Sequence, residues 1–169
     1  MLSLYLIGLA LFLAIIHGLY LRHQEKEFYF PALFLMYLLF CNVGLMGFLG
    51  FFSHTAYSGE TANLIGWPLG TPFQYEIAMA NLGFGVLGLL CIFIRTLSFW
   101  FATIVGSSVF LFGALGVHLY EYYKNRNTAP YNMGLFIWIM DLFVPLLLLA
   151  LFAFVFKNKD KFTNLPFNK

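Results

Sequence analysis

Five long apolar segments, separated by short polar ones, make up most of this chain. They cover residues 2–21, 29–52, 73–94, 98–122 and 133–156. Each is about twenty residues or longer, which allows a helix to cross a hydrocarbon core of about 30 Å. The pattern predicts an all-α fold: a polytopic bundle of five transmembrane helices in contact with the lipid bilayer.

Composition supports this class and excludes others. The chain of 169 residues is 62% hydrophobic and 9% charged, whereas a soluble domain carries about 25% charged residues. We therefore expect one transmembrane domain over residues 1–169. The net charge of +2 indicates no nucleic-acid partner, and a homo-oligomer stays open.

Charge predicts the orientation. Lys124 and Arg126 follow the fourth apolar segment, while the other basic residues fall on the opposite side: Arg22, Lys26, Arg95, Lys157, Lys159, Lys161 and Lys169. By the positive-inside rule the C-terminus lies in the cytoplasm and the N-terminus outside. The pattern suggests a multi-pass protein of a bacterial inner membrane.

Polar side chains within the apolar segments indicate a site. An ionisable group in a membrane costs about 2.5–3.5 kcal/mol on insertion scales, so it faces a partner, a cavity or a ligand. Helical rise predicts a shallow tier near the outer interface and a deeper tier below it. The shallow tier is Glu76, His118 and Glu121, and the deeper tier is Asn42, Asn81 and Asp141.

The shallow tier suggests a metal. His118 and Glu121 are three residues apart and share a helix face. With Glu76 they could hold a divalent zinc, iron or manganese ion. The alternative is that Glu121 is solvated and His118 bonds to Glu76 or a tyrosine. A bis-histidine haem needs two histidines at matched depth. Only His54 with His118 comes close, so we do not expect haem.

Asp141 is the deep acidic group. Pro145 cannot donate a backbone hydrogen bond to the carbonyl of Asp141, which loosens the helix there. This suggests a site for a cation, a proton or a polar ligand. The alternative is a protonated Asp141 that joins helices by bonding to Asn81 or Asn42. Glu76 and Asn81 point to opposite sides of one helix, so we do not expect both to touch one ligand.

The connection from Ser53 to Thr71 is predicted to be a loop that covers the outer mouth, with Trp67 as its anchor. His54 ends the preceding helix. We expect Thr71 to cap the next helix, with Gln74 completing a capping box. Small-residue stripes predict packing faces on two helices. They are Ala78, Asn81, Gly85 and Gly88 on the third helix, and Gly106, Gly113 and Gly116 on the fourth.

The segment from Gly66 to Glu76 reads GWPLGTPFQYE, and residues 80–88 read ANLGFGVLG. With residues 116–118 (GVH), 129–134 (APYNMG) and 141–145 (DLFVP), this resembles a family of small prokaryotic integral membrane proteins catalogued only as a domain of unknown function. The resemblance covers about residues 45–150. It implies that Glu76, His118 and Asp141 act together, and it implies no activity.

Three functions follow. The first is a binding protein or small enzyme with a polar pocket near the outer face, which takes a metal or a small molecule. The second is a proton- or cation-coupled transport component that uses Asp141. The third is a structural or assembly subunit. Whether the protein is an enzyme is left open.

Overall fold

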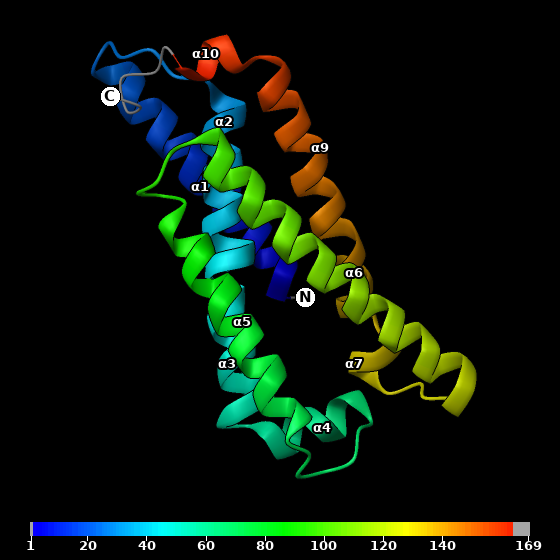
Figure 1. The fold of residues 1–169 in the computed structure, drawn as a ribbon. Helices are drawn as coiled ribbons and strands as arrows, with labels where there is room; N and C mark the ends of the chain where they lie inside the picture. Colours follow the sequence, from blue (N-terminus) through cyan, green and yellow to red (C-terminus); the bar gives the residue numbers. More distant parts are fainter. Residues whose placement is uncertain (1, 164–169) are drawn as a thin grey trace.

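The computed structural model describes residues 2–163. They form a bundle of helices, and no strand occurs within this range (Figure 1). Five helical stretches are long and apolar enough to cross a membrane, as predicted: Leu2–His23, Phe30–Thr55, Phe73–Leu90, Leu97–Asn125 and Pro130–Lys157. Lys169, which entered the charge argument, lies outside the described residues.

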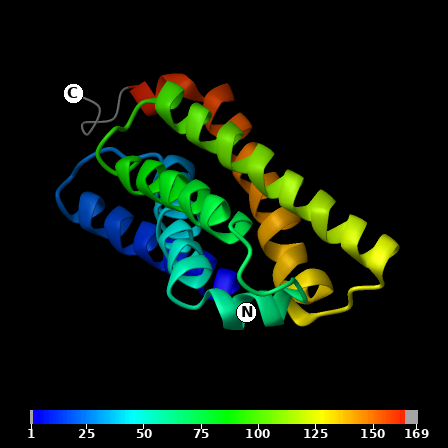
Figure 2. The same cartoon turned by 60° about the horizontal axis from the view of Figure 1, so that its bottom comes forward.

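The helix at the centre of the bundle is the second stretch. It comprises α2 (Phe30–Leu38), a π-helical turn η1 (Leu39–Leu45) and α3 (Met46–Thr55), and it is the most buried of the five stretches. It contains no charged residue, so other helices can surround it without burying an unpaired charge. The helices α1 (Leu2–His23), α5 (Phe73–Leu90), α6 (Leu97–Asn125) and α9 (Val144–Lys157) lie around it (Figures 1 and 2).

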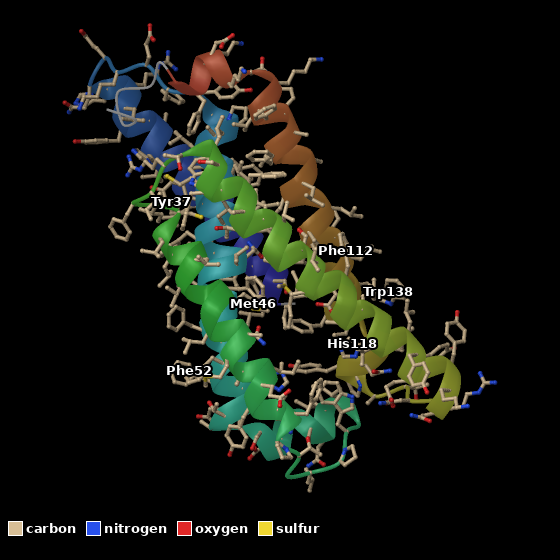
Figure 3. The ribbon with its side chains drawn as sticks, in the orientation of Figure 1. Tyr37, Met46, Phe52, Phe112, His118 and Trp138 are labelled. Atoms are coloured by element: carbon tan, nitrogen blue, oxygen red, sulfur yellow. The ribbon has the colours of Figure 1, made fainter. Side chains whose placement is uncertain are left out.

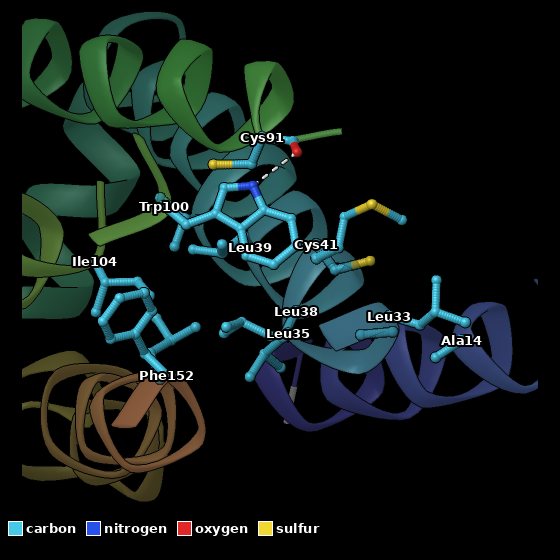
Figure 4. Packing of buried hydrophobic residues seen from close by; sticks show 14 of the residues in the cluster. Ala14, Leu33, Leu35, Leu38, Leu39, Cys41, Cys91, Trp100, Ile104 and Phe152 are labelled. Carbon is cyan, nitrogen blue, oxygen red and sulfur yellow. Dashed lines mark hydrogen bonds between the residues drawn. The ribbon is translucent and has the colours of Figure 1, made fainter. Parts of the chain in front are cut away.

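The apolar core lies in the half of the bundle that holds the turn between α5 and α6. Leu35, Leu38, Ile104 and Trp100 are fully buried there (Figure 4). The indole Nε1 of Trp100 donates to the carbonyl of Cys91 at 3.0 Å. This bond satisfies the buried indole and fixes the turn between the two helices.

Glycines bring the central helix and α5 into backbone contact. A Cβ at Gly47 would lie 2.6 Å from the carbonyl oxygen of Asn81 and from Cα of Gly85. A Cβ at Gly88 would collide with the backbone at Gly44. The packing face predicted on α5 is therefore confirmed at Gly85 and Gly88.

The glycine stripe predicted on α6 is wrong for two of its three members. A Cβ at Gly113 or Gly116 would meet nothing within 4 Å, whereas one at Gly106 would lie 3.3 Å from the ring of Phe84. Both outer glycines are exposed because α6 diverges from α5 beyond their shared turn (Figures 1 and 2).

The connection between the second and third stretches is not the loop predicted for residues 53–71. α3 extends to Thr55, and α4 (Ser58–Ile65) follows almost at once. α4 buries Thr61, Ala62 and Ile65 on one side and ends at Gly66, whose φ of 80° favours glycine. The pattern was missed because the amphipathic segment has only eight residues.

The capping box predicted at the start of α5 is also wrong. Pro72 occupies the N-cap position, and no side chain caps the helix. The side chain of Gln74 is buried and bonds elsewhere.

The last membrane stretch is broken where Pro145 predicted loosening. It runs through α7 (Pro130–Met133), α8 (Leu135–Ile137) and the π-helical turn η2 (Trp138–Phe143) before α9. A short terminal helix, α10 (Lys159–Thr163), follows. The proline removes one backbone donor, and a π turn accommodates the missing bond. Asp141 lies within this turn.

The glycine contact should be required for stability. We expect Gly47→Leu to lower the free energy of unfolding by about 3 kcal/mol or to prevent folding, because the added side chain must separate two backbones. Gly113→Leu is the matched control, since its side chain meets open space. Thermal unfolding in detergent measures both, and equal effects of the two changes would contradict this account.

Candidate functional site

A cavity of about 560 Å³ lies between α3, α4, α5, α6 and η2. Its size is in the range of small-molecule sites. Most of its lining is apolar, with Trp67, Phe73 and Phe136 among its aromatic residues. Three of the polar residues predicted from sequence to form a site line it on different elements: His54, His118 and Asp141.

His118 is held by Asn132, in α7. The imidazole Nδ1 lies 2.9 Å from Oδ1 of Asn132, and both side chains are buried. The Nδ2 amide of Asn132 donates to the carbonyls of His118, at 3.2 Å, and Asn127, at 2.8 Å. These bonds occupy both amide hydrogens, so Oδ1 is an acceptor and Nδ1 carries the proton.

The other imidazole nitrogen faces a carboxyl group. Nε2 of His118 lies 3.8 Å from Oδ2 of Asp141. In the neutral ring Nε2 is an acceptor, as is a carboxylate oxygen. The distance is too long for a direct hydrogen bond. The two atoms therefore form a pair that takes one proton, or one donor group placed between them.

Trp67 covers this pair. Its ring stacks on the ring of His118 with centroids 6.2 Å apart and an interplanar angle of 11°, and it also contacts Phe73. Figure 3 shows His118 on the part of α6 that lies toward α7. The segment before Trp67 is tied down because Nδ2 of Asn127 donates to the carbonyl of Ile65 at 2.9 Å.

His54 lines the cavity from α3, and a side-chain amide fixes it in the same way. Its Nδ1 lies 3.0 Å from Oε1 of Gln74, whose Nε2 donates to the carbonyl of Ser58 at 2.9 Å. The amide nitrogen is thereby identified, so Oε1 accepts and Nδ1 of His54 is the protonated nitrogen.

Glu76 and Glu121 lie outside the cavity. Glu76 is exposed on α5, and Glu121 is partly exposed near the end of α6, where it accepts a hydrogen bond from Nδ2 of Asn125 at 2.8 Å. Among residues 2–163, no three histidine, cysteine or acidic side chains are arranged to hold a metal ion. The predicted ligand set of Glu76, His118 and Glu121 does not assemble: His118 is buried and lines the cavity, whereas Glu76 is exposed and Glu121 partly exposed, outside it.

The two predicted asparagines have different positions. Asn81 lines the cavity, but its Nδ2 donates to the carbonyl of Ile77 in its own helix at 2.9 Å. Asn42 is buried in η1 away from the cavity, and its amide has no hydrogen-bond partner within the described part of the chain. The helix-joining alternative required a hydrogen bond from Asp141 to Asn81 or Asn42, and neither bond is formed. Of Glu76 and Asn81, only Asn81 lines the cavity.

Sequence reasoning missed Asn132 and Asn127, which anchor the histidine and the covering segment. Asn127 lies between the fourth and fifth membrane stretches, and Asn132 lies in α7 at the start of the fifth, at the same end of the bundle as His118. A buried imidazole requires a partner for its N–H. The polar residues that follow α6, at the same depth as His118, were therefore the signal that could have identified its partner.

Removal of the Asn132 anchor should be costly. We expect Asn132→Leu, which keeps the volume, to lower the free energy of unfolding by about 1–3 kcal/mol, since buried donors and acceptors lose their partners. The matched control is Asn125→Leu, at an exposed position, with an expected change within about 0.5 kcal/mol. Detergent unfolding curves provide the measurement. Similar curves for the two variants would show that the anchor is dispensable.

Comparison with known proteins gives one result. No curated protein matches the chain, and no solved structure matches it. The family of unknown function DUF6790 matches residues 1–161, which is nearly the whole chain. The protein with this cavity belongs to the family of unknown function DUF6790.

Proposed function

We propose that the protein binds an amphiphilic small molecule inside the membrane and exchanges a proton with its polar group through His118 and Asp141. The observation that carries this proposal is the separation of 3.8 Å between two acceptor atoms on the wall of the cavity. A ligand hydroxyl placed between them would donate to one atom. The pair would thereby serve as a binding site or as a general base.

The cavity is reachable from the bilayer. Leu49, Phe73 and Val117 line it and are 42%, 45% and 45% exposed. Exposed apolar side chains of a membrane helix face lipid tails. An amphiphile could therefore enter laterally, leave its tail among these residues and place its polar group at His118.

The other two functions predicted from sequence have less support. A proton or cation path that left Asp141 along α9 would meet only apolar buried residues: Val144, Pro145, Leu148, Phe152 and Val155. A purely structural role leaves the volume of the cavity without a use. A metal-dependent role lacks the three-ligand cluster within the described residues.

We also propose the orientation that the charges predict for a protein of the bacterial inner membrane. The N-terminus lies outside the cell, and the C-terminus lies in the cytoplasm. His118, Asn132 and Trp67 then lie toward the outer face. Lys124 and Arg126 lie beyond them, so few positive charges need to cross the membrane.

The binding proposal is testable with a decylphenol, which has one hydroxyl donor and one apolar tail. We expect saturable binding by protein in lipid nanodiscs above the level of empty discs. Because the hydroxyl donates to one atom of the pair, His118→Ala or Asp141→Asn should weaken binding by about tenfold, the upper range for one lost hydrogen bond. Radiolabelled decylphenol would measure the affinity.

Glu76→Gln is the control, because this side chain is exposed and lies away from the cavity. Its affinity should equal that of the unmodified protein. Binding that is absent, or that survives both His118→Ala and Asp141→Asn, would contradict the proposal.

A further inference from the structure

The cavity has a second hydrogen-bonding group that the His118–Asp141 pair does not use. His54 lines it from α3, whereas His118 lines it from α6. These two helices lie apart at this end of the bundle (Figures 1 and 2). A ligand in the cavity therefore meets imidazole groups from two sides.

The two histidines are held in the same protonation form. Each Nδ1–H donates to a side-chain amide oxygen, on Asn132 for His118 and on Gln74 for His54. Each amide nitrogen is in turn bound to backbone carbonyls. This arrangement fixes ring orientation and leaves Nε2 as the free nitrogen, as it does in many functional histidines.

The free nitrogen of His54 has no protein partner. Its Nδ1 is the only ring nitrogen with a hydrogen bond among the described residues, and Nε2 keeps some accessible surface on a residue that lines the cavity. Gln74 does not compete for it, since both ends of its amide are engaged. His54 thus presents a fixed, unoccupied acceptor to the cavity.

The aromatic lining of the cavity favours a flat apolar body. Trp67, Phe73, Phe110 and Phe136 all line the cavity, and aromatic side chains pack well against the edges and faces of other rings. A ligand that satisfies both acceptors needs hydrogen-bond donors on two sides of such a body.

We infer that the ligand is a membrane-soluble aromatic diol, with one hydroxyl at the His118–Asp141 pair and the other at Nε2 of His54. This inference rests on the proposed function and adds a second recognition residue to it. The simplest molecule of this class is a hydroquinone with an alkyl tail. The tail would leave the cavity past Leu49 and Val117 toward the lipid.

The test compares two probes that differ by one hydroxyl, a decylphenol and a decylhydroquinone, the latter kept reduced with ascorbate under nitrogen. In protein reconstituted in nanodiscs the diol should bind about three- to tenfold more tightly, the gain of one hydrogen bond. His54→Phe keeps an aromatic ring but removes the acceptor. It should abolish this gain, so that the variant binds decylphenol and decylhydroquinone with equal affinity.

Two further variants make the result decisive. His54→Ala repeats the test if the larger ring disturbs packing, and His23→Phe, an exposed position at the end of α1, should preserve the gain. Failure of both probes to bind would overturn the proposed function itself. Binding of decylphenol with no gain for the diol, or a gain that persists without His54, would overturn only the inference of a diol.

Discussion

The backbone contact between the central helix and α5 determines how the remaining helices are arranged. Gly47 and Gly44 on one side and Gly85 and Gly88 on the other leave no room for a side chain between them. In a membrane this type of contact replaces the hydrophobic driving force, because lipid tails are as apolar as the helix surfaces. The contact holds α5 along η1 and α3. It thereby positions Phe73 and Gln74 at the end of the bundle where α6 has diverged, and the space left there is the cavity.

A second constraint acts on the polar groups around that space. A buried imidazole without a partner for its N–H is costly, and more so in a membrane. Both cavity histidines meet this constraint with an amide whose other end is fixed to the backbone. Each amide stabilises the fold and also fixes the tautomer of its histidine, because it determines which ring nitrogen remains an acceptor.

The sequence was sufficient for the parts that depend on one-dimensional patterns. Apolar segments identified five membrane stretches, and Pro145 indicated the break around Asp141. Helical rise assigned His118 and Asp141 to different tiers, whereas the structure brings their side chains to 3.8 Å. The contribution of Gln74 and the exclusion of Glu76 depend on rotation about the axis of α5. Small errors in the start of a helix change that rotation by 100° per residue. Asn132 was missed for another reason: it acts from a four-residue helix that no periodic pattern indicates.

The glycine contact has a consequence for how this protein could diversify. The close backbone contact is made by glycines of η1, α3 and α5, whereas much of the cavity wall comes from α4, α6, α8 and η2. A substitution at Phe110, Ile137 or Val117 changes the shape of the chamber without entering the seam of glycines. Ligand specificity can then change through substitutions that leave the thermal stability of the bundle unaltered. Descendants of one ancestral sequence could share this scaffold and its anchored histidines yet accept different molecules.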